Sequence, residues 1–431
     1  MGAEAGRREG WVERGGVRLH YVEWAPDGAE PPALLLLHGL SSNALIWERV
    51  AAALPHRRIV ALDQRSHGLS DRPETGYGQA DLVADAAHAV AELGLGRPVV
   101  AGHSWGASVA LSLAAAHPES AAGLMLVDGG FSTLSGMMTW ADAAARMQPP
   151  LPVYQDLEAA SDAQAAYLDE AWGPDLVDFV QAGLVEAPGG GLTVKLTAPV
   201  RLLILRDLFD LDPLPLVSDV AGPLVLAVAG VTWPGPEGER FADWKRRSVE
   251  TIQEARPEVL ARWFESRHDI PLYQPGALAQ DLDRLATASA LEQVARVAAG
   301  LQADWSRPAH GDEAGWDAKD LLAHLASTQV AIAGIAAAPP AAAAEMAERP
   351  AFEPDRWNSS QVRRRRETPV ADLVTELRQG ADRTWAALPA ADLAAITGIG
   401  RYAGRPLGLA LAAMGAHQLG HLAELEQALA G

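Results

Sequence analysis

A serine between two glycines, directly after an apolar run, constrains this chain more than any other feature. Residues 102–106 read Gly-His-Ser-Trp-Gly, follow the apolar run 98–101, and lead into the helix-like segment 107–111. A strand that passes straight into a helix through such a turn is sterically crowded, and the two glycines omit the side chains that would collide. We therefore expect Ser104 to be lifted clear of a sheet, where its hydroxyl can act as a nucleophile.

The first part of the chain alternates between apolar runs and helical patterns. Five further strand-like runs are residues 17–22, 33–37, 58–62, 124–127 and 223–229. The segment 79–92 is one of the helical patterns between them. This alternation predicts a mostly parallel sheet with helices on both faces. Ligands of such sheets bind beyond the carboxyl ends of the strands, where Ser104 falls.

Two other regions depart from this alternation. Residues of about 131–221 are helical and aromatic in character and include three consecutive glycines, so we expect a helical cap over the site. After residue 285 the strand-like runs end, and helical patterns follow. These patterns cover about residues 290–301, 317–337, 369–388 and 408–430. They predict a four-helix bundle over 287–431, after an α/β domain over 1–286.

Composition excludes several classes of chemistry and partner. The 431 residues include no cysteine, which rules out disulfides, thiolate nucleophiles and cysteine metal sites. The formal net charge of −20 argues against nucleic acid or an anionic membrane as a main partner. No apolar run reaches transmembrane length and the N-terminus lacks an apolar signal core. We expect a cytoplasmic protein that acts on a small molecule, with its oligomeric state open.

Four motifs within about residues 15–286 closely resemble those of the α/β-hydrolase superfamily. They are residues 38–40 (His-Gly-Leu), 63–70 (Asp-Gln-Arg-Ser-His-Gly-Leu-Ser), the turn 102–106 and residues 268–271 (His-Asp-Ile-Pro). The second motif departs from the family's D-x-R-G-H-G-x-S pattern, because Ser66 replaces a glycine. A serine at position 104 is typical of esterase-like members. It argues against the dehalogenase and epoxide-hydrolase branches, whose nucleophile is an aspartate.

The resemblance assigns roles to the residues around Ser104. Acyl transfer by serine needs a base, an orienting acid and hydrogen-bond donors for the oxyanion. His268 lies late in the domain, where the chain order serine, acid, histidine places the base. The backbone N–H groups of Leu40 and Trp105 are the expected oxyanion donors. We expect this domain to need no cofactor.

The acid departs from the family pattern. It usually follows the strand predicted at 223–229, but residues 230–237 contain no aspartate. Two candidates remain: Asp128, which follows the preceding strand, and Glu237, which lies several residues late in the expected loop. Some family members place the acid after the preceding strand, so Asp128 is favoured and Glu237 is the alternative. Asp269 is disfavoured, because adjacent residues cannot easily orient each other's side chains.

Three histidines of the predicted bundle form a candidate metal site. His417 and His421 are four residues apart, so they share one face of a helix, and His324 lies mid-helix near the start of the domain. Three neutral imidazoles can hold a divalent transition metal and leave a position open to water or substrate.

The bundle resembles the DinB-like family, including the N-terminal domain of mycothiol-dependent maleylpyruvate isomerases. The resemblance rests on residues 315–326 (Gly-Trp-Asp-Ala-Lys-Asp-Leu-Leu-Ala-His-Leu-Ala) and on the late histidine pair. It implies that His324, His417 and His421 ligate a metal, with Zn or Ni most plausible. It also implies a low-molecular-weight thiol as a candidate partner.

Three functional hypotheses follow. The leading one is a serine hydrolase of small, fairly apolar esters, lactones or C–C-cleavable ketones, with Ser104, His268 and Asp128 as its triad. The second is a bifunctional protein whose bundle is a metal-dependent thiol transferase or isomerase. The third is a hydrolase fold that binds a ligand without turnover.

Overall fold

The chain divides into two compact units. The computed structural model describes residues 6–147, 151–302, 304–309, 315–339, 353–397, 402 and 404–430. One unit comprises Met1–Ala29 with Ala33–Asp281, and the other comprises Glu30–Pro32 with Leu282–Gly431. The division at residue 281 and the predicted boundary at residue 286 both fall inside helix α11 (Pro275–Gly300). The boundary at residue 286 therefore stays a prediction.

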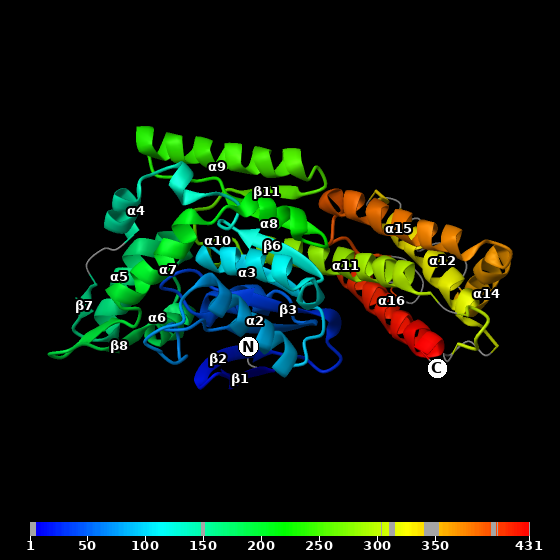
Figure 1. The fold of residues 1–431 in the computed structure, drawn as a ribbon, viewed down its shortest axis with the longest axis horizontal. Helices are drawn as coiled ribbons and strands as arrows, with labels where there is room; N and C mark the ends of the chain where they lie inside the picture. The colour runs from blue at the N-terminus through cyan, green and yellow to red at the C-terminus, as the bar shows by residue number, and fades with distance from the viewer. Residues whose placement is uncertain are drawn as a thin grey trace. The chain divides into compact units, whose positions relative to one another are not determined.

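The first unit is built on an eight-stranded sheet with strand order β1-β2-β4-β3-β5-β6-β10-β11 (Figure 1). The strands are β1 (Arg7–Arg14), β2 (Val17–Trp24), β3 (Glu30–Leu37), β4 (Arg57–Leu62), β5 (Val99–His103), β6 (Gly123–Val127), β10 (Leu224–Ala229) and β11 (Leu260–Phe264). From β3 through β5, β6 and β10 to β11 the neighbouring strands are parallel, whereas β1, β2 and β4 pair antiparallel. Every residue of β5, β6 and β10 is buried, as expected for strands covered on both faces. The predicted mostly parallel sheet is confirmed.

Helices cover this sheet and supply most of the remaining core. Those outside the cap region are α1 (Glu48–Ala52), α2 (Gln79–Glu92), α3 (Trp105–Ala116), α9 (Pro236–Ala255) and α10 (Ile270–Tyr273). The predicted helix 79–92 coincides with α2. Helix α3 packs directly on β5 and β6, and ten of its twelve residues are buried. This packing fixes where α3 begins, and it therefore also fixes the turn at Ser104, the residue before the helix. Short 3-10 helices span Ala44–Trp47, Pro118–Ser120, Leu134–Gly136, Asp169–Ala171, Pro174–Leu176 and, in the second unit, Leu388–Ala390.

The region predicted as a helical cap, residues 131–221, is more varied than the sequence indicated. Its helices are α4 (Trp140–Met147), α5 (Leu157–Leu168), α6 (Val177–Ala182), α7 (Ala198–Asp210) and α8 (Pro213–Asp219). It also holds a three-stranded antiparallel sheet of order β7-β9-β8, made of β7 (Val153–Tyr154), β8 (Leu184–Glu186) and β9 (Leu192–Val194). Strands of two or three residues leave too little periodicity to be recognised in a sequence. Gly189, Gly190 and Gly191 form the turn between β8 and β9, and all three have positive φ.

The turn at Ser104 owes its shape to close backbone contacts. A Cβ atom at Gly102 would lie 2.1 Å from the carbonyl oxygen of Gly106, and one at Gly106 would lie 2.4 Å from that of His38. Ser104 itself has φ 55° and ψ −119°, in a region that L-residues rarely adopt. The surrounding sheet and helix hold this conformation, because its backbone N–H donates to the carbonyl of Val127 on β6.

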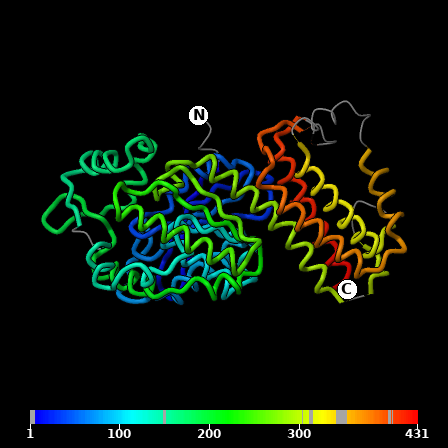
Figure 2. Tube along the Cα trace, turned by 90° about the horizontal axis from the view of Figure 1, so that it is seen from above, coloured from blue at the N-terminus to red at the C-terminus, as the bar shows by residue number. Residues whose placement is uncertain are grey.

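The second unit is helical (Figure 2, yellow to red). Beyond α11, its helices are α12 (Ala318–Ala336), α14 (Pro354–Arg365), α15 (Val370–Ala387) and α16 (Leu407–Ala430). Helix α12 packs against α14, α15 and α16 around two clusters of buried aliphatic side chains. Helix α11 begins 15 residues earlier than the pattern at 290–301 indicated, and α14 was not among the four predicted helices. None of the helices in the described part of the chain is long and apolar enough to cross a membrane.

Gly102→Ala should destabilise the first unit by about 3 kcal/mol, because its methyl group has no space beside Gly106. Chemical denaturation followed by circular dichroism measures the change. Gly276→Ala is the matched control, since Gly276 is exposed and a Cβ there meets nothing within 4 Å. Equal stability of the two variants would contradict this account of the turn.

Candidate active site and histidine cluster

Ser104 and His268 line one cavity of about 260 Å³ in the first unit. Its floor is formed at the carboxyl ends of β3 and β5, by Leu40 and Ser104 among others. The cap contributes further lining residues, namely Tyr154, Tyr167, Phe179, Gln164 and Leu184. The cavity therefore lies where a doubly covered sheet is expected to bind its ligand.

Asp128 and His268 are joined by a short hydrogen bond. Asp128 follows the last residue of β6, and its Oδ2 lies 2.7 Å from Nδ1 of His268 in the loop after β11. The carboxylate is 3% exposed, whereas the His268 side chain is 46% exposed and borders the cavity. Nδ1 is thus engaged with the acid, which leaves the other side of the imidazole ring for the cavity.

Asp128 is held from two further directions. Its Oδ1 accepts hydrogen bonds from the backbone N–H of Ala229 and from Nζ of Lys245, each at 3.0 Å. Burial raises the pKa of Asp128, but the hydrogen bond and charge of His268, together with Lys245, outweigh burial and leave that pKa lowered. Desolvation of the imidazole by the surrounding protein lowers the pKa of His268. The hydrogen bond and the charge of Asp128 outweigh this effect, so the pKa of His268 is raised overall. The pair therefore favours an ionised acid beside a basic imidazole.

The other two carboxylates considered from the sequence do not occupy this position. Glu237 lies in the first turn of α9, where its exposed side chain pairs with Arg146 at 3.3 Å and with Arg240 at 3.8 Å. Asp269 accepts a hydrogen bond from the Tyr167 hydroxyl at 3.2 Å. The structure thus brings Asp128 to His268 and leaves Glu237 on the surface.

The expected oxyanion donors belong to the residue after Ser104 and to the loop after β3. Trp105 is the first residue of α3, so its N–H belongs to the first turn, where amides have no acceptor within the helix. Leu40 lies in the loop after β3 and lines the cavity. Buried His38 braces this loop: its ring nitrogens bond the carbonyl of Gly39 at 2.7 Å and the N–H of Gln64 at 3.0 Å.

The motif at residues 63–70 forms a hydrogen bond with the same loop through His67. His67 accepts a hydrogen bond from the N–H of Ser41 at 3.1 Å, and burial lowers the pKa of His67 to about 3, so it is neutral. Ser66 occupies the left-handed region with φ 64°, where the family pattern has glycine. Its hydroxyl lies 2.6 Å from that of Tyr77, a local contact that offsets the unfavourable backbone conformation.

Sequence reasoning missed two residues next to the pair. His103 is buried, and its Nε2 donates to the carbonyl oxygen of His268 at 3.0 Å. Burial lowers the pKa of His103 to about 4, so the ring is neutral and holds the His268 loop. Lys245 begins a run of three cations on α9, residues 245–247, and such a run indicates a solvent-facing position. Its sequence context gave no signal of its role, whereas His103 at least belonged to the turn motif.

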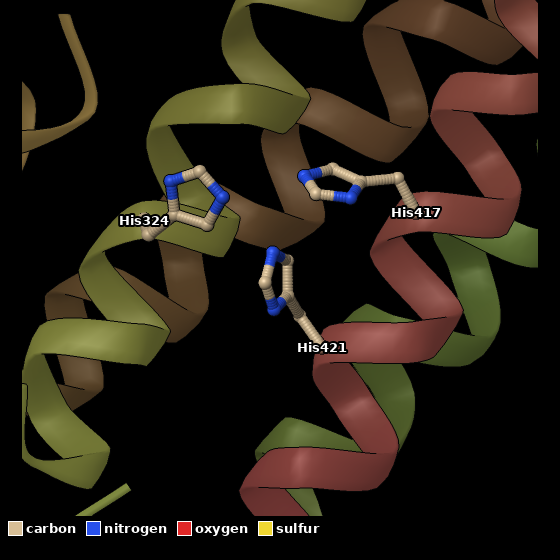
Figure 3. A group of neighbouring side chains, drawn as sticks. All are labelled: His324, His417 and His421. Atoms are coloured by element: carbon tan, nitrogen blue, oxygen red, sulfur yellow. The ribbon is translucent and has the colours of Figure 1, made fainter. Parts of the chain in front are cut away.

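In the second unit, His324 of α12 and His417 and His421 of α16 point toward one another (Figure 3). Each offers a ring nitrogen, and these atoms all lie within 4.8 Å of one another. The ring planes of His324 make angles of 85° with His417 and 87° with His421. This convergence of imidazoles fits a divalent transition metal.

Two neighbours orient the histidine cluster. Glu424 lies one turn after His421, and its carboxylate is 2.8 Å from Nδ1 of that ring, which leaves Nε2 for a ligand. Trp316 packs against His324 with ring centroids 5.3 Å apart. Such a carboxylate–histidine contact fixes the tautomer of a metal ligand and raises its basicity.

Comparison with known families assigns each unit. The α/β hydrolase fold family matches residues 32–167, and the mycothiol maleylpyruvate isomerase N-terminal domain family matches residues 287–414. The expected pairing of these two families in one chain is confirmed.

Relatives of the first unit are hydrolases. Epoxide hydrolase B of Mycobacterium tuberculosis is 28% identical over 272 residues, which cover 60% of this chain and 69% of the relative. Lipase LipV of the same species is 32% identical over 216 residues, covering 49% of this chain and 79% of the lipase. The structure of E-2-(acetamidomethylene)succinate hydrolase matches with a TM-score of 0.53 and 21% identity, over 65% of this chain and 98% of that one. This last likeness concerns the fold.

Asp128→Asn should lower the pKa of His268 by about one unit or more, because the charge that raises it is removed. NMR titration of the labelled imidazole measures this shift. Glu237→Gln is the matched control and should leave the titration unchanged, since Glu237 pairs with surface arginines. A lowered pKa in Glu237→Gln together with an unchanged pKa in Asp128→Asn would make Glu237 the partner of His268.

Proposed function

Since the chain belongs to the α/β-hydrolase family and carries a mycothiol maleylpyruvate isomerase N-terminal domain, we propose that its first unit is a serine hydrolase. Ser104 is the nucleophile, His268 the base and Asp128 the acid that orients it. The observation that supports this most is the 2.7 Å hydrogen bond between Asp128 and His268, at the cavity that Ser104 lines.

The reaction follows from this arrangement. The Ser104 hydroxyl attacks a substrate carbonyl as His268 takes its proton, and Asp128 stabilises the imidazolium through Nδ1–H. The N–H groups of Leu40 and Trp105 receive the developing oxyanion, a contribution of about 3 kcal/mol for each such donor. His268 then gives the proton to the leaving group. Water attacks the acyl group as His268 takes a proton from it, and His268 passes this proton to the Ser104 oxygen as the product acid leaves.

The size of the cavity and its aromatic side chains support small substrates with apolar groups, and polar side chains line part of it as well. Its volume of about 260 Å³ is slightly below the usual range for drug-sized ligands, and three aromatic side chains line it. Within the described residues, no lysine or arginine side chain lines it. Small esters, lactones and C–C-cleavable ketones fit these limits. Several relatives are epoxide hydrolases, but the serine at position 104 favours acyl transfer, because that branch uses an aspartate as its nucleophile.

Ser104→Ala should abolish labelling by a fluorophosphonate probe and lower p-nitrophenyl ester hydrolysis by at least about 1000-fold, because the attacking atom is lost. Ser108→Ala, a buried serine one turn further along α3, is the control and should keep both activities. Labelling that survives Ser104→Ala would rule out this nucleophile. No hydrolysis of any ester in a broad panel by the unaltered protein would favour a ligand-binding fold without turnover.

A second function is supported by the histidine cluster. We propose that His324, His417 and His421 hold Zn or Ni, and that the second unit acts on a low-molecular-weight thiol or its adducts. A bound divalent metal would supply positive charge that favours the deprotonated form of a thiol or water ligand. The chain would then be bifunctional.

After incubation with zinc or nickel and dialysis, elemental analysis should find about one metal per chain. His417→Ala combined with His421→Ala should lose it, because two of the three ligands are removed. His117→Ala, an exposed histidine of the first unit, is the control and should retain the metal. Metal that persists in the double variant would place the site elsewhere.

A further inference from the structure

Lys245 is a buried lysine on the face of α9 that also buries Val249 and Ile252. Its neighbours Arg246 and Arg247 on α9 are exposed, whereas the Lys245 side chain is 4% exposed. A buried ammonium is costly unless a carboxylate and other acceptors surround it. The buried charge of Lys245 must therefore be compensated by specific partners.

The ammonium of Lys245 is directed at the acid of the site. Nζ lies 3.0 Å from Oδ1 of Asp128 and also donates to the carbonyl oxygen of Ala229, the last residue of β10. The N–H of Ala229 donates to the same Oδ1 at 3.0 Å. The ring of Phe241, one turn earlier on α9, lies 5.2 Å from Nζ. Ala229, at the end of β10, thus forms hydrogen bonds with both Asp128 and Lys245.

The two oxygens of Asp128 consequently have separate partners. Oδ2 bonds His268, while Oδ1 is occupied by Lys245 and Ala229. Because Oδ1 is fixed by two donors, the carboxylate cannot rotate away from the imidazole without breaking both contacts. With His268 neutral, the charges of Asp128 and Lys245 cancel.

We propose that Lys245 is a positioning residue of the hydrolase site, which orients Asp128 and offsets part of its charge so that less of His268 is held as the imidazolium. This inference rests on the proposed serine hydrolase function. An acid without this counter-charge would bind the imidazolium more strongly and leave less free base for Ser104.

The other charged groups around His268 act in the opposite direction to Lys245. Asp269 accepts a hydrogen bond from the Tyr167 hydroxyl. Its charge raises the pKa of His268, as that of Asp128 does, whereas the charge of Lys245 lowers this pKa. His103 stacks against His268 with ring centroids 4.8 Å apart and is neutral near pH 7. Two carboxylates therefore favour the imidazolium, and Lys245 is the cation that opposes them.

The test is the titration of His268 in Lys245→Met and Lys245→Gln, followed by NMR of the labelled imidazole. Removing the cation makes the site one charge more negative, so the His268–Asp128 pair should take up its proton about one pH unit higher. The acid limb of kcat/KM should shift upward equally, so that activity lost at neutral pH returns at higher pH. A purely structural defect would lower kcat/KM at every pH.

Three controls separate the explanations. Lys245→Arg keeps the charge and should titrate as the unaltered protein does. Lys195→Met should not move the titration, because Nζ of Lys195 donates to the carbonyls of Gly68 and Ser70 rather than to a carboxylate. Should Lys245→Met fail to fold, adding Asp128→Asn should restore folding, because the uncompensated buried charge is then removed.

An unchanged His268 titration in folded Lys245→Met and Lys245→Gln would overturn the proposal, as would a failure of Asp128→Asn to restore folding. The NMR titration needs no turnover. A charge effect on His268 in a protein that hydrolyses no ester would therefore contradict the serine hydrolase function and leave the Lys245 contact standing.

Discussion

The close approach of α3 to the strands beneath it is the constraint on which the first unit depends. At Gly102 and Gly106 there is no room for a single methyl group, because the carbonyls of Gly106 and His38 occupy that space. This crowding forces Ser104 into a strained backbone conformation and directs it to the edge of the sheet where β3, β5 and β6 end. Strain of this kind persists only where the surroundings determine it, and the buried strands provide such surroundings.

Asp128 illustrates how the same sheet can supply an acid from a different strand. It follows β6, and the N–H of Ala229 at the end of β10 bonds its Oδ1. Asp128 has φ 45°, which turns the chain sharply at this point. The neighbouring glycine at 129 allows the turn, since a Cβ there would lie 2.2 Å from the carbonyl oxygen of Ser104. The backbone next to Asp128, the proposed acid, is thus packed against that of Ser104, the proposed nucleophile.

The parts of the fold that could be predicted are those in which complete burial gives the sequence a recognisable apolar pattern. Strands such as β5, β6 and β10 are covered on both faces and read as continuous apolar runs. The edge strands β1 and β11 were missed, because exposed charged and aromatic side chains interrupt their patterns. Motif spacing identified Ser104 and His268 as candidates. A buried charge such as Lys245 has no sequence signature, since its burial is set by a contact 117 residues away.

Cap and core are linked beside His268, the proposed base. The Tyr167 hydroxyl near the end of α5 bonds Asp269, the residue after His268, and the Tyr273 hydroxyl donates to the carbonyl of Leu168 at 2.9 Å. Both contacts connect the last turn of α5 with the segment that begins at His268. Helix α5 also contributes Gln164 and Tyr167 to the cavity lining, so a displacement of this helix would act on the loop that carries the imidazole. The shape of the cavity wall and the orientation of the imidazole thus depend on the same hydrogen bonds, and a substitution at Tyr167 would alter both.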